Sequence, residues 1–186
     1  MNKFKLSLFF ILWASLFSSC ALADENGYSV SEAKQAPPFC LGLDLKYFQD
    51  SAAYLKTNVK LPGKDGHHFC NGMKKILRGD YKSAVNEFDY VEGRSSSISD
   101  NELLDSVCLY KAEALGKMGQ TGLALQEYNK AIQLNPKYHQ AYARLADFYL
   151  KLGMKQDALD TINTGLKFSP NSKGLRNRLH KLTTEK

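Results

Sequence analysis

His67, His68 and Cys70 form the densest group of potential metal ligands in this chain of 186 residues. A structural zinc site normally combines two ligand pairs, each with a short and regular spacing. No second pair stands near this group, and its own spacing does not match a zinc pattern. We therefore expect no metal and no cofactor, and interpret the group as a surface turn ahead of a helix. A metal- or thiol-dependent enzyme that uses these three residues remains an alternative.

The motifs of the common catalytic sites are missing from the sequence. Ser95, Ser96 and Ser97 form a run of serines without the G-x-S-x-G turn that exposes a nucleophilic serine. Gly63 and Gly66 are not followed by the glycine and lysine of a phosphate-binding loop. No two cysteines form a Cys-x-x-Cys redox pair. The sequence therefore predicts that the protein is not an enzyme.

Apart from Cys20 near the N-terminus, the chain has three cysteines, which divide into a pair and a single residue. Cys40 and Cys70 flank an irregular N-terminal region, whereas Cys108 falls inside a predicted helix. We predict a disulfide between Cys40 and Cys70, which would stabilise the fold by about 3–4 kcal/mol in the chain-entropy model. Because a sequence alone does not fix the pairing of cysteines, three free buried thiols remain the alternative.

Residues 1–23 have the features of a secretory signal peptide. Lys3 and Lys5 precede an apolar run over 6–17, and the small residues Ala21 and Ala23 offer a cleavage site. The apolar run is short for a membrane span. Export would bring the mature chain into an oxidising compartment, and we expect the bacterial periplasm.

Cys20 offers a second interpretation of the same region. Residues 16–20 resemble a bacterial lipobox, although Phe17 is atypical at its place. Lipidation of Cys20 would make the protein a membrane-anchored lipoprotein, and a membrane contact is expected only in that case. Removal of the signal leaves 25 − 2 = 23 basic and 19 acidic residues. This weak and scattered charge excess does not indicate a nucleic-acid partner.

Two stretches of the chain match each other at a spacing of 34 residues. The matching pairs are Ala112 and Ala146, Gly119 and Gly153, Ala124 and Ala158, and Pro136 and Pro170. A period of this size marks a solenoid, in which each unit buries its apolar face against a neighbour. The pattern predicts helices over 102–117, 121–134, 138–152 and 155–168, with proline ending the second helix of each unit.

These units resemble the tetratricopeptide repeat (TPR) family, which has fixed places for large and small apolar residues. The unit 139–172 supplies Tyr142, Leu145, Ala146, Tyr149, Ala158, Ile162, Gly165 and Pro170, and the unit 105–138 supplies Cys108, Ala112, Leu115, Ala124, Tyr128, Ala131 and Pro136. Lys111 departs from the pattern at the seventh place, where the family has leucine. A degenerate unit over 65–98 is similar through Gly72, Gly79, Ala84 and Phe88, and an insertion near 93–100 separates it from the next unit.

The resemblance implies an all-α, right-handed α-solenoid of helical hairpins. We expect a signal peptide over 1–23, a flexible lead-in over 24–39, a less regular segment over 40–64 with a helix at 42–56, and a TPR domain over 65–186. The TPR domain would end in a capping helix within 171–183, whose polar face keeps the last apolar surface away from water.

The resemblance also implies a concave groove lined by the first helix of each unit. Its expected lining is Phe69, Met73, Leu109, Tyr110, Glu113, Lys117, Gln140, Arg144, Asp147 and Lys151. A lining of mixed charge and apolar side chains could hold a protein or peptide partner. Leu109, Glu113 and Asp147 stand where some relatives have a clamp for a terminal carboxylate, so we expect no such clamp.

The sequence thus predicts an exported, non-catalytic scaffold or adaptor. The main alternative is an envelope assembly factor anchored through a lipid on Cys20. Nothing in the sequence identifies the partner or indicates the oligomeric state.

Overall fold

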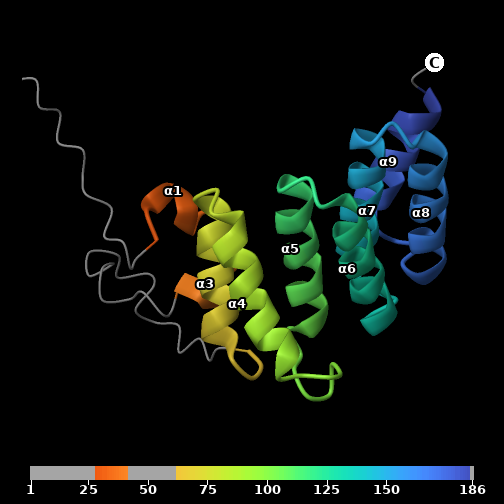
Figure 1. Ribbon diagram of the computed structural model, residues 1–186. Helices are drawn as coiled ribbons and strands as arrows, with labels where there is room; N and C mark the ends of the chain where they lie inside the picture. Colours follow the sequence, from red (N-terminus) through yellow and green to blue (C-terminus); the bar gives the residue numbers. More distant parts are fainter. Residues whose placement is uncertain (1–27, 42–61, 185–186) are drawn as a thin grey trace, which may run out of the picture.

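The computed structural model describes residues 28–41 and 62–184, whose regular elements are all helices (Figure 1). Six of these helices form three antiparallel hairpins: α3 (Gly66–Leu77) with α4 (Tyr81–Gly93), α5 (Leu104–Lys117) with α6 (Thr121–Leu134), and α7 (His139–Lys151) with α8 (Lys155–Phe168). The hairpins stack in chain order, and α9 (Lys173–Thr184) covers the last one (Figure 1). The chain is therefore an α-solenoid. The signal peptide, Cys20 and the helix expected over 42–56 lie outside the described residues.

The turn inside each hairpin contains a glycine with a left-handed backbone. Gly79, Gly119 and Gly153 have φ angles of 76°, 75° and 77°, a region that other residues enter only with strain. Each turn is followed at once by the second helix of its hairpin, and in the first hairpin Asp80 accepts a hydrogen bond from the backbone of Ser83 at 3.2 Å. The 34-residue period thus reflects the repetition of one turn geometry.

Small residues allow the helices to approach closely. A Cβ atom added to Gly72 would lie 2.5 Å from the ring of Phe88, and one added to Gly165 would lie 2.7 Å from Cγ of Tyr142. Ala112 is fully buried at the place that corresponds to Gly72. Each aromatic ring therefore occupies the space that a larger side chain would need, which fixes the distance between the paired helices.

Lys111 departs from the repeat pattern because it forms a partly buried charge network. Its ammonium group lies 2.7 Å from Asp89, 2.5 Å from Glu92 and 2.7 Å from Glu127, and so connects α4, α5 and α6. Lys130 also pairs with Glu92. Burial tends to raise the pKa of Glu92, but the hydrogen bonds from the two lysines outweigh it and hold that pKa below its usual value. A polar network thus joins the first and second hairpins.

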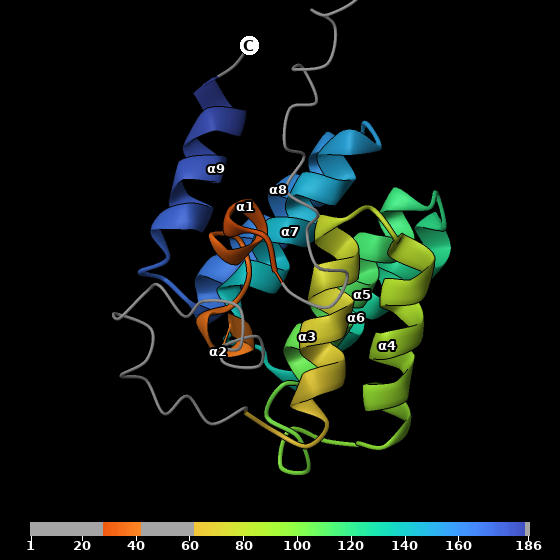
Figure 2. The same ribbon diagram turned by 90° about the vertical axis from the view of Figure 1, so that its left-hand side faces the viewer.

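The N-terminal segment 28–41, which we call the strap, packs against α3 on the side away from α4 (Figure 2). It contains two one-turn helices, α1 (Val30–Ala33) and α2 (Pro38–Leu41). The prediction of a flexible lead-in over 24–39 is therefore wrong for residues 28–39. Tyr28 and Ala36 are buried in the same core as the first hairpin, and Cys40 is joined to Cys70 by a disulfide.

The strap is also tied to α3 by an ion pair with a measurable signature. Arg78 donates to Glu32 from Nε at 2.8 Å and from Nη2 at 3.3 Å. These bonds lower the pKa of Glu32 from 4.5 to about 2. Because the carboxylate is stabilised in the folded state, its contribution to stability is complete above pH 4.5 and is lost as the pH falls towards 2.

We expect replacement of Arg78 by glutamine to return the pKa of Glu32 towards 4.5. The carboxyl carbon of Glu32 can be followed by NMR during a pH titration of both proteins. A matched variant, Lys75→Gln, removes a neighbouring cation that pairs with Asp80 instead and should leave the Glu32 titration unchanged. A Glu32 pKa near 4.5 in the unmodified protein would contradict the ion pair.

None of the described helices combines the length and the apolar composition needed to cross a membrane.

Candidate functional site

A cavity that we call the main cavity, the larger of the two described below, lies between α5, α7 and the start of α9. It has a volume of 790 Å³. Its lining consists of Leu109 and Tyr110 from α5, His139, Gln140, Ala143 and Arg144 from α7, the loop residues Ser169, Pro170, Asn171 and Ser172, and Lys173, Gly174 and Arg178 from α9. Apolar side chains of α5 and α7 thus meet polar groups of the α8–α9 loop and α9 at one site.

The charged residues that line this cavity are all basic. Arg144, Lys173 and Arg178 contribute cationic groups, and neither aspartate nor glutamate is among the lining residues. Each arginine also has an acidic neighbour outside the lining. Arg178 donates to both carboxylate oxygens of Asp147, at 2.8 and 2.7 Å, and Nε of Arg144 lies 3.1 Å from Glu113. The arginines are therefore oriented by the fold, and Lys173 remains exposed at the rim.

A second cavity of 610 Å³ shares Arg144 with the first. It is lined by Glu113, Gly116, Lys117, Tyr128, Arg144, Asp147, Phe148 and Lys151, and so contains both signs of charge. Burial raises the pKa of Glu113, and the nearby cations Arg144, Lys151 and Lys117 only partly oppose this effect. The two cavities adjoin at Arg144, and we call them together the groove, which is basic near α9 and mixed in charge near the hairpin turns.

Most of the residues expected to line the groove do so in the structure. Leu109, Tyr110, Gln140 and Arg144 line the first cavity, and Glu113, Lys117, Asp147 and Lys151 line the second. The assignment of Phe69 and Met73 needs correction. They are 1% and 4% exposed, because they lie in the core that the strap shares with α3.

The sequence did not predict that α9 and the loop before it contribute to this cavity. The capping helix was expected only to present a polar face to water, but its Lys173 and Arg178 line the main cavity. The amphipathic pattern alone could not show this, because the position of these residues depends on the angle at which α9 crosses α7. His139, at the start of α7, is a further lining residue that the repeat pattern did not predict.

The histidine and cysteine group near the start of α3 is divided among other contacts. Cys70 is in the disulfide, and Nδ1 of His68 lies 2.6 Å from a carboxylate oxygen of Glu87. The ring of His68 also packs on Tyr90, with 3.9 Å between the centroids. The three side chains therefore do not converge on a common point as ligands.

Within the described residues, Glu92, Cys108 and Glu127 form another group with ligand atoms within 4.8 Å of one another. The ammonium group of Lys111 contacts both carboxylates and supplies the positive charge there. Burial raises the pKa of the Cys108 thiol, which disfavours the reactive thiolate. The group is thus explained as part of the charge network.

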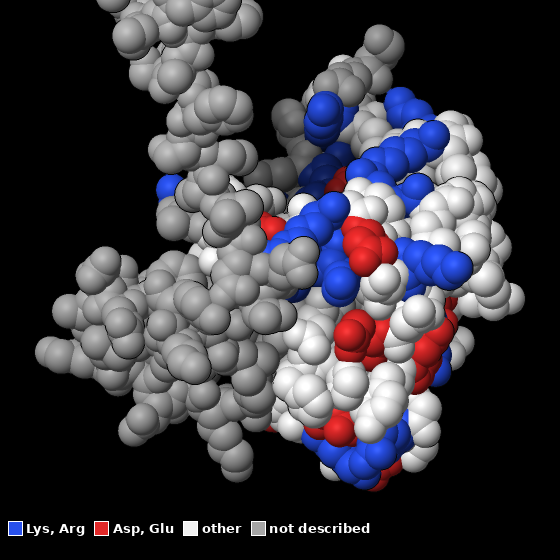
Figure 3. All heavy atoms as spheres, turned by 60° about the vertical axis from the view of Figure 1, so that its left-hand side comes forward, with Lys and Arg blue, Asp and Glu red and all other residues white. Residues whose placement is uncertain are grey.

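Charge on the rest of the molecule is mixed where it can be seen. On the face drawn in Figure 3, lysine and arginine side chains alternate with aspartate and glutamate over the described surface.

Comparisons with known proteins agree with the repeat architecture. Residues 117–180 match a family model described as tetratricopeptide repeat. A curated relative, tetratricopeptide repeat protein 4 homolog from Dictyostelium discoideum, is 30% identical over 107 residues, which cover 54% of this chain and 27% of the relative. The matched region thus spans about a quarter of that relative's length.

Three solved structures resemble the fold. The first TPR of Spaghetti (RPAP3), bound to the HSP90 peptide SRMEEVD, has a TM-score of 0.52 at 21% identity, and the match covers 64% of this chain and 93% of that one. The second TPR domain of human RPAP3, in complex with the HSP70 peptide SGPTIEEVD, gives 0.50 at 21% identity over 63% and 93%. The Cut9–Hcn1 hetero-tetramer of the APC/C gives 0.57 at 17% identity over 78% and 29%.

Proposed function

Since the chain is a tetratricopeptide repeat protein, we propose that it is a non-catalytic adaptor that binds a partner segment in the groove between α5, α7 and α9. The observation that carries the proposal is the main cavity, which combines an apolar floor with three basic side chains. Leu109 and Ala143 on the floor would bury apolar side chains of the partner, which contributes affinity. Arg144, Lys173 and Arg178 would select its charge.

The chemistry of the cavity favours an acidic segment. Arginine binds carboxylates with two parallel hydrogen bonds, so Arg144, whose Nε lies 3.1 Å from Glu113, suits an aspartate or glutamate side chain of a partner. Arg178 already donates to both oxygens of Asp147 and from Nη1 to the carbonyl of Gly174, so it supplies mainly positive charge to the cavity. The peptides in two of the similar solved structures contain acidic residues, which supports this class of ligand without identifying one for this chain.

We expect Arg144→Glu to weaken the binding of acidic peptides at least tenfold, which corresponds to about 1.4 kcal/mol. The measurement is fluorescence anisotropy with labelled ten-residue peptides of equal length that contain zero, two or four acidic residues. The unmodified protein should bind more tightly as the number of acidic residues rises. Arg144→Gln removes the cation without adding a carboxylate beside Glu113, and should show a smaller loss in the same direction.

Lys82→Glu provides the matched control, because Lys82 is an exposed residue of α4 that lines neither cavity. It changes the net charge as Arg144→Glu does, so a general electrostatic effect would weaken binding equally in both. Equal affinities for all three peptides, or equal losses in the two variants, would rule out the basic cavity as the binding site. Asp147 is unsuitable for charge reversal because it holds Arg178 and therefore α9.

Export and anchoring are separate parts of the proposal. The signal-like residues 1–23 and the Cys40–Cys70 disulfide support export to an oxidising compartment such as a bacterial periplasm. The alternative is an envelope factor anchored by a lipid on Cys20. Mass spectrometry of the mature N-terminus separates the two, since cleavage after Ala23 leaves Asp24 first and lipidation leaves a modified Cys20.

A further inference from the structure

The repeat places that line the groove on α5 and α7 also occur on α3, in the first hairpin. On α3 the residues at these places are covered. In the repeat pattern, Cys70 corresponds to Tyr110 and Arg144, which both line the main cavity. Met73 corresponds to Glu113 and Asp147, which line the second cavity. Phe69, at the place of Leu109 and Ala143, is 1% exposed. The groove therefore continues onto α3, where the strap fills it.

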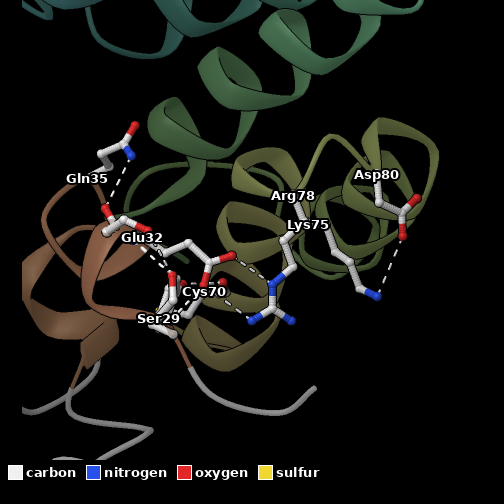
Figure 4. Close-up of polar contacts among 9 residues, drawn as sticks. Ser29, Glu32, Gln35, Cys70, Lys75, Arg78 and Asp80 are labelled. Carbon is white, nitrogen blue, oxygen red and sulfur yellow. Dashed lines mark hydrogen bonds and ion pairs between the residues drawn. The ribbon is translucent and has the colours of Figure 1, made fainter. Parts of the chain in front are cut away.

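The strap contacts this face as a bound peptide would. The hydroxyl of Tyr28 donates to the backbone carbonyl of Cys70 at 2.7 Å, and the ammonium group of Lys74 lies 4.8 Å from the centroid of the Tyr28 ring. The ring of Phe39 packs against Phe69, with 5.8 Å between the centroids. Figure 4 shows how Glu32 extends from the strap to Arg78, the residue directly after α3.

The local structure of the strap does not hold it in this position. Its two helices have four residues each, and helices of this length are not stable in isolation. The strap therefore depends on its contacts with α3. The Cys40–Cys70 disulfide adds a direct covalent link between the strap and α3, which raises the effective concentration of the strap beside α3. Without the disulfide, 21 residues (42–62) separate Leu41 from Gly63, and the strap is held only by its non-covalent contacts.

We infer that the strap is a built-in occupant of one third of the groove, and that the Cys40–Cys70 disulfide locks it there. The inference rests on the proposed function and adds a regulation to it. In the oxidised protein a partner reaches only the part of the groove formed by α5, α7 and α9. Once the disulfide is cleaved, the strap detaches reversibly and exposes α3 to solvent. The exposed face then accepts a partner segment of the same kind, which has aromatic and aliphatic side chains and a carboxylate that reaches Arg78.

Cleavage requires a dithiol as reductant. The dithiol supplies two electrons and two protons, the bond between the two sulfur atoms breaks, Cys40 and Cys70 become thiols, and the reductant becomes a disulfide. Both cysteines are buried, with exposed fractions of 0% and 1%. A thiolate therefore reaches the bond only when the strap opens locally, so the lock resists brief exposure to a reductant.

Hydrogen exchange of the full chain tests the lock. We expect reduction by dithiothreitol to speed the exchange of backbone amides in the strap at least tenfold, while the amides of α5 to α8 keep their rates. Cys40→Ala should behave like the reduced protein without any reductant. Cys108→Ala keeps the disulfide, so it should match the unmodified protein before and after reduction, which excludes an effect of the third thiol.

A peptide probe tests whether the uncovered face binds. The probe is a fluorescein-labelled peptide with the sequence of residues 28–41, in which serine replaces Cys40 so that it cannot form a disulfide. We expect no binding to the oxidised protein, saturable binding to Cys40→Ala, and tighter binding to Cys40→Ala with Glu32→Arg, because that change weakens the tethered strap as a competitor. The probe keeps the glutamate that corresponds to Glu32, so it can pair with Arg78 in each of these variants.

Three results would overturn the inference: a strap that stays protected after reduction, a reduction that speeds exchange in α5 to α8 as well, and a probe that fails to bind the strap-weakened variant. The first would show that the disulfide is not needed as a lock. The second would show that the disulfide stabilises the whole fold and not the strap alone. None of them depends on the acidic peptides or on Arg144, so the proposed function can fail or hold separately.

Discussion

Replacement of Lys111 by methionine is expected to lower the free energy of unfolding by about 3 kcal/mol. Methionine fills a similar volume but removes the ammonium group that contacts Asp89, Glu92 and Glu127. The side chains of Lys111 and Glu92 are each only 12% exposed, so the remaining carboxylates are poorly solvated. The loss is placed at the lower end for a buried pair because Asp89 is half exposed and Lys130 still pairs with Glu92.

Urea denaturation followed by circular dichroism measures this loss, and Lys130→Met is the matched control. Lys130 contacts the same Glu92, but its side chain is 45% exposed, so its removal should cost about 1 kcal/mol or less. Adding Glu127→Gln to Lys111→Met should recover part of the stability, because one uncompensated charge disappears. Equal effects of the two lysine substitutions would contradict a role for burial.

The pH dependence of the same variant has a definite sign. In the unmodified protein the pKa of Glu92 is held below its usual 4.5, so the network stabilises the fold above that pH and is lost as the pH falls through the lowered value. In Lys111→Met the lysine no longer opposes the effect of burial on Glu92, so protonation of Glu92 removes an uncompensated charge. The difference in stability between the two proteins should therefore shrink between pH 7 and pH 4.

The network shows what a repeat pattern can and cannot predict. The 34-residue period was sufficient to predict the hairpins, their turns and the helix ends at Pro136 and Pro170, because these depend on local sequence. It marked Lys111 as a departure from the pattern but could not supply a reason. The acidic partners belong to α4 and α6, and an insertion between the first two units shifts the register that would have aligned them.

The strap and the contribution of α9 to the basic cavity were not predicted from the sequence, for the same physical cause. Residues 28–39 contain too few apolar positions to show a periodicity, and their partners on α3 are distant along the chain. The Cys40–Cys70 pair was the one signal that connected the two segments. Arg178 looked like a solvated side chain because the pattern of α9 defines which face is apolar, but not which neighbour its polar face approaches.

The role of α9 in the groove leads to the second large effect. We expect Leu175→Ala to lower the stability of α9 by about 3 kcal/mol, the cost of truncating a buried leucine and leaving a cavity. Leu175 is fully buried in a cluster with Tyr142 and Ile162, and it approaches the space beside Gly165. Because each solenoid unit contacts only its neighbours, the loss should be confined to α9 and the adjoining surface of the last hairpin.

Hydrogen exchange resolved by segment measures this effect, and Leu182→Ala is the control because Leu182 is only partly buried near the end of the same helix. The amides of α9 should exchange much faster in Leu175→Ala, with little change in α5 and α6. If the proposed cavity binds acidic peptides, their affinity should fall in parallel, because Lys173 and Arg178 leave the site when α9 detaches, although Arg144 is unchanged. Faster exchange spread evenly from α3 to α9 would mean that the solenoid unfolds as one unit and that α9 is not an independent cap.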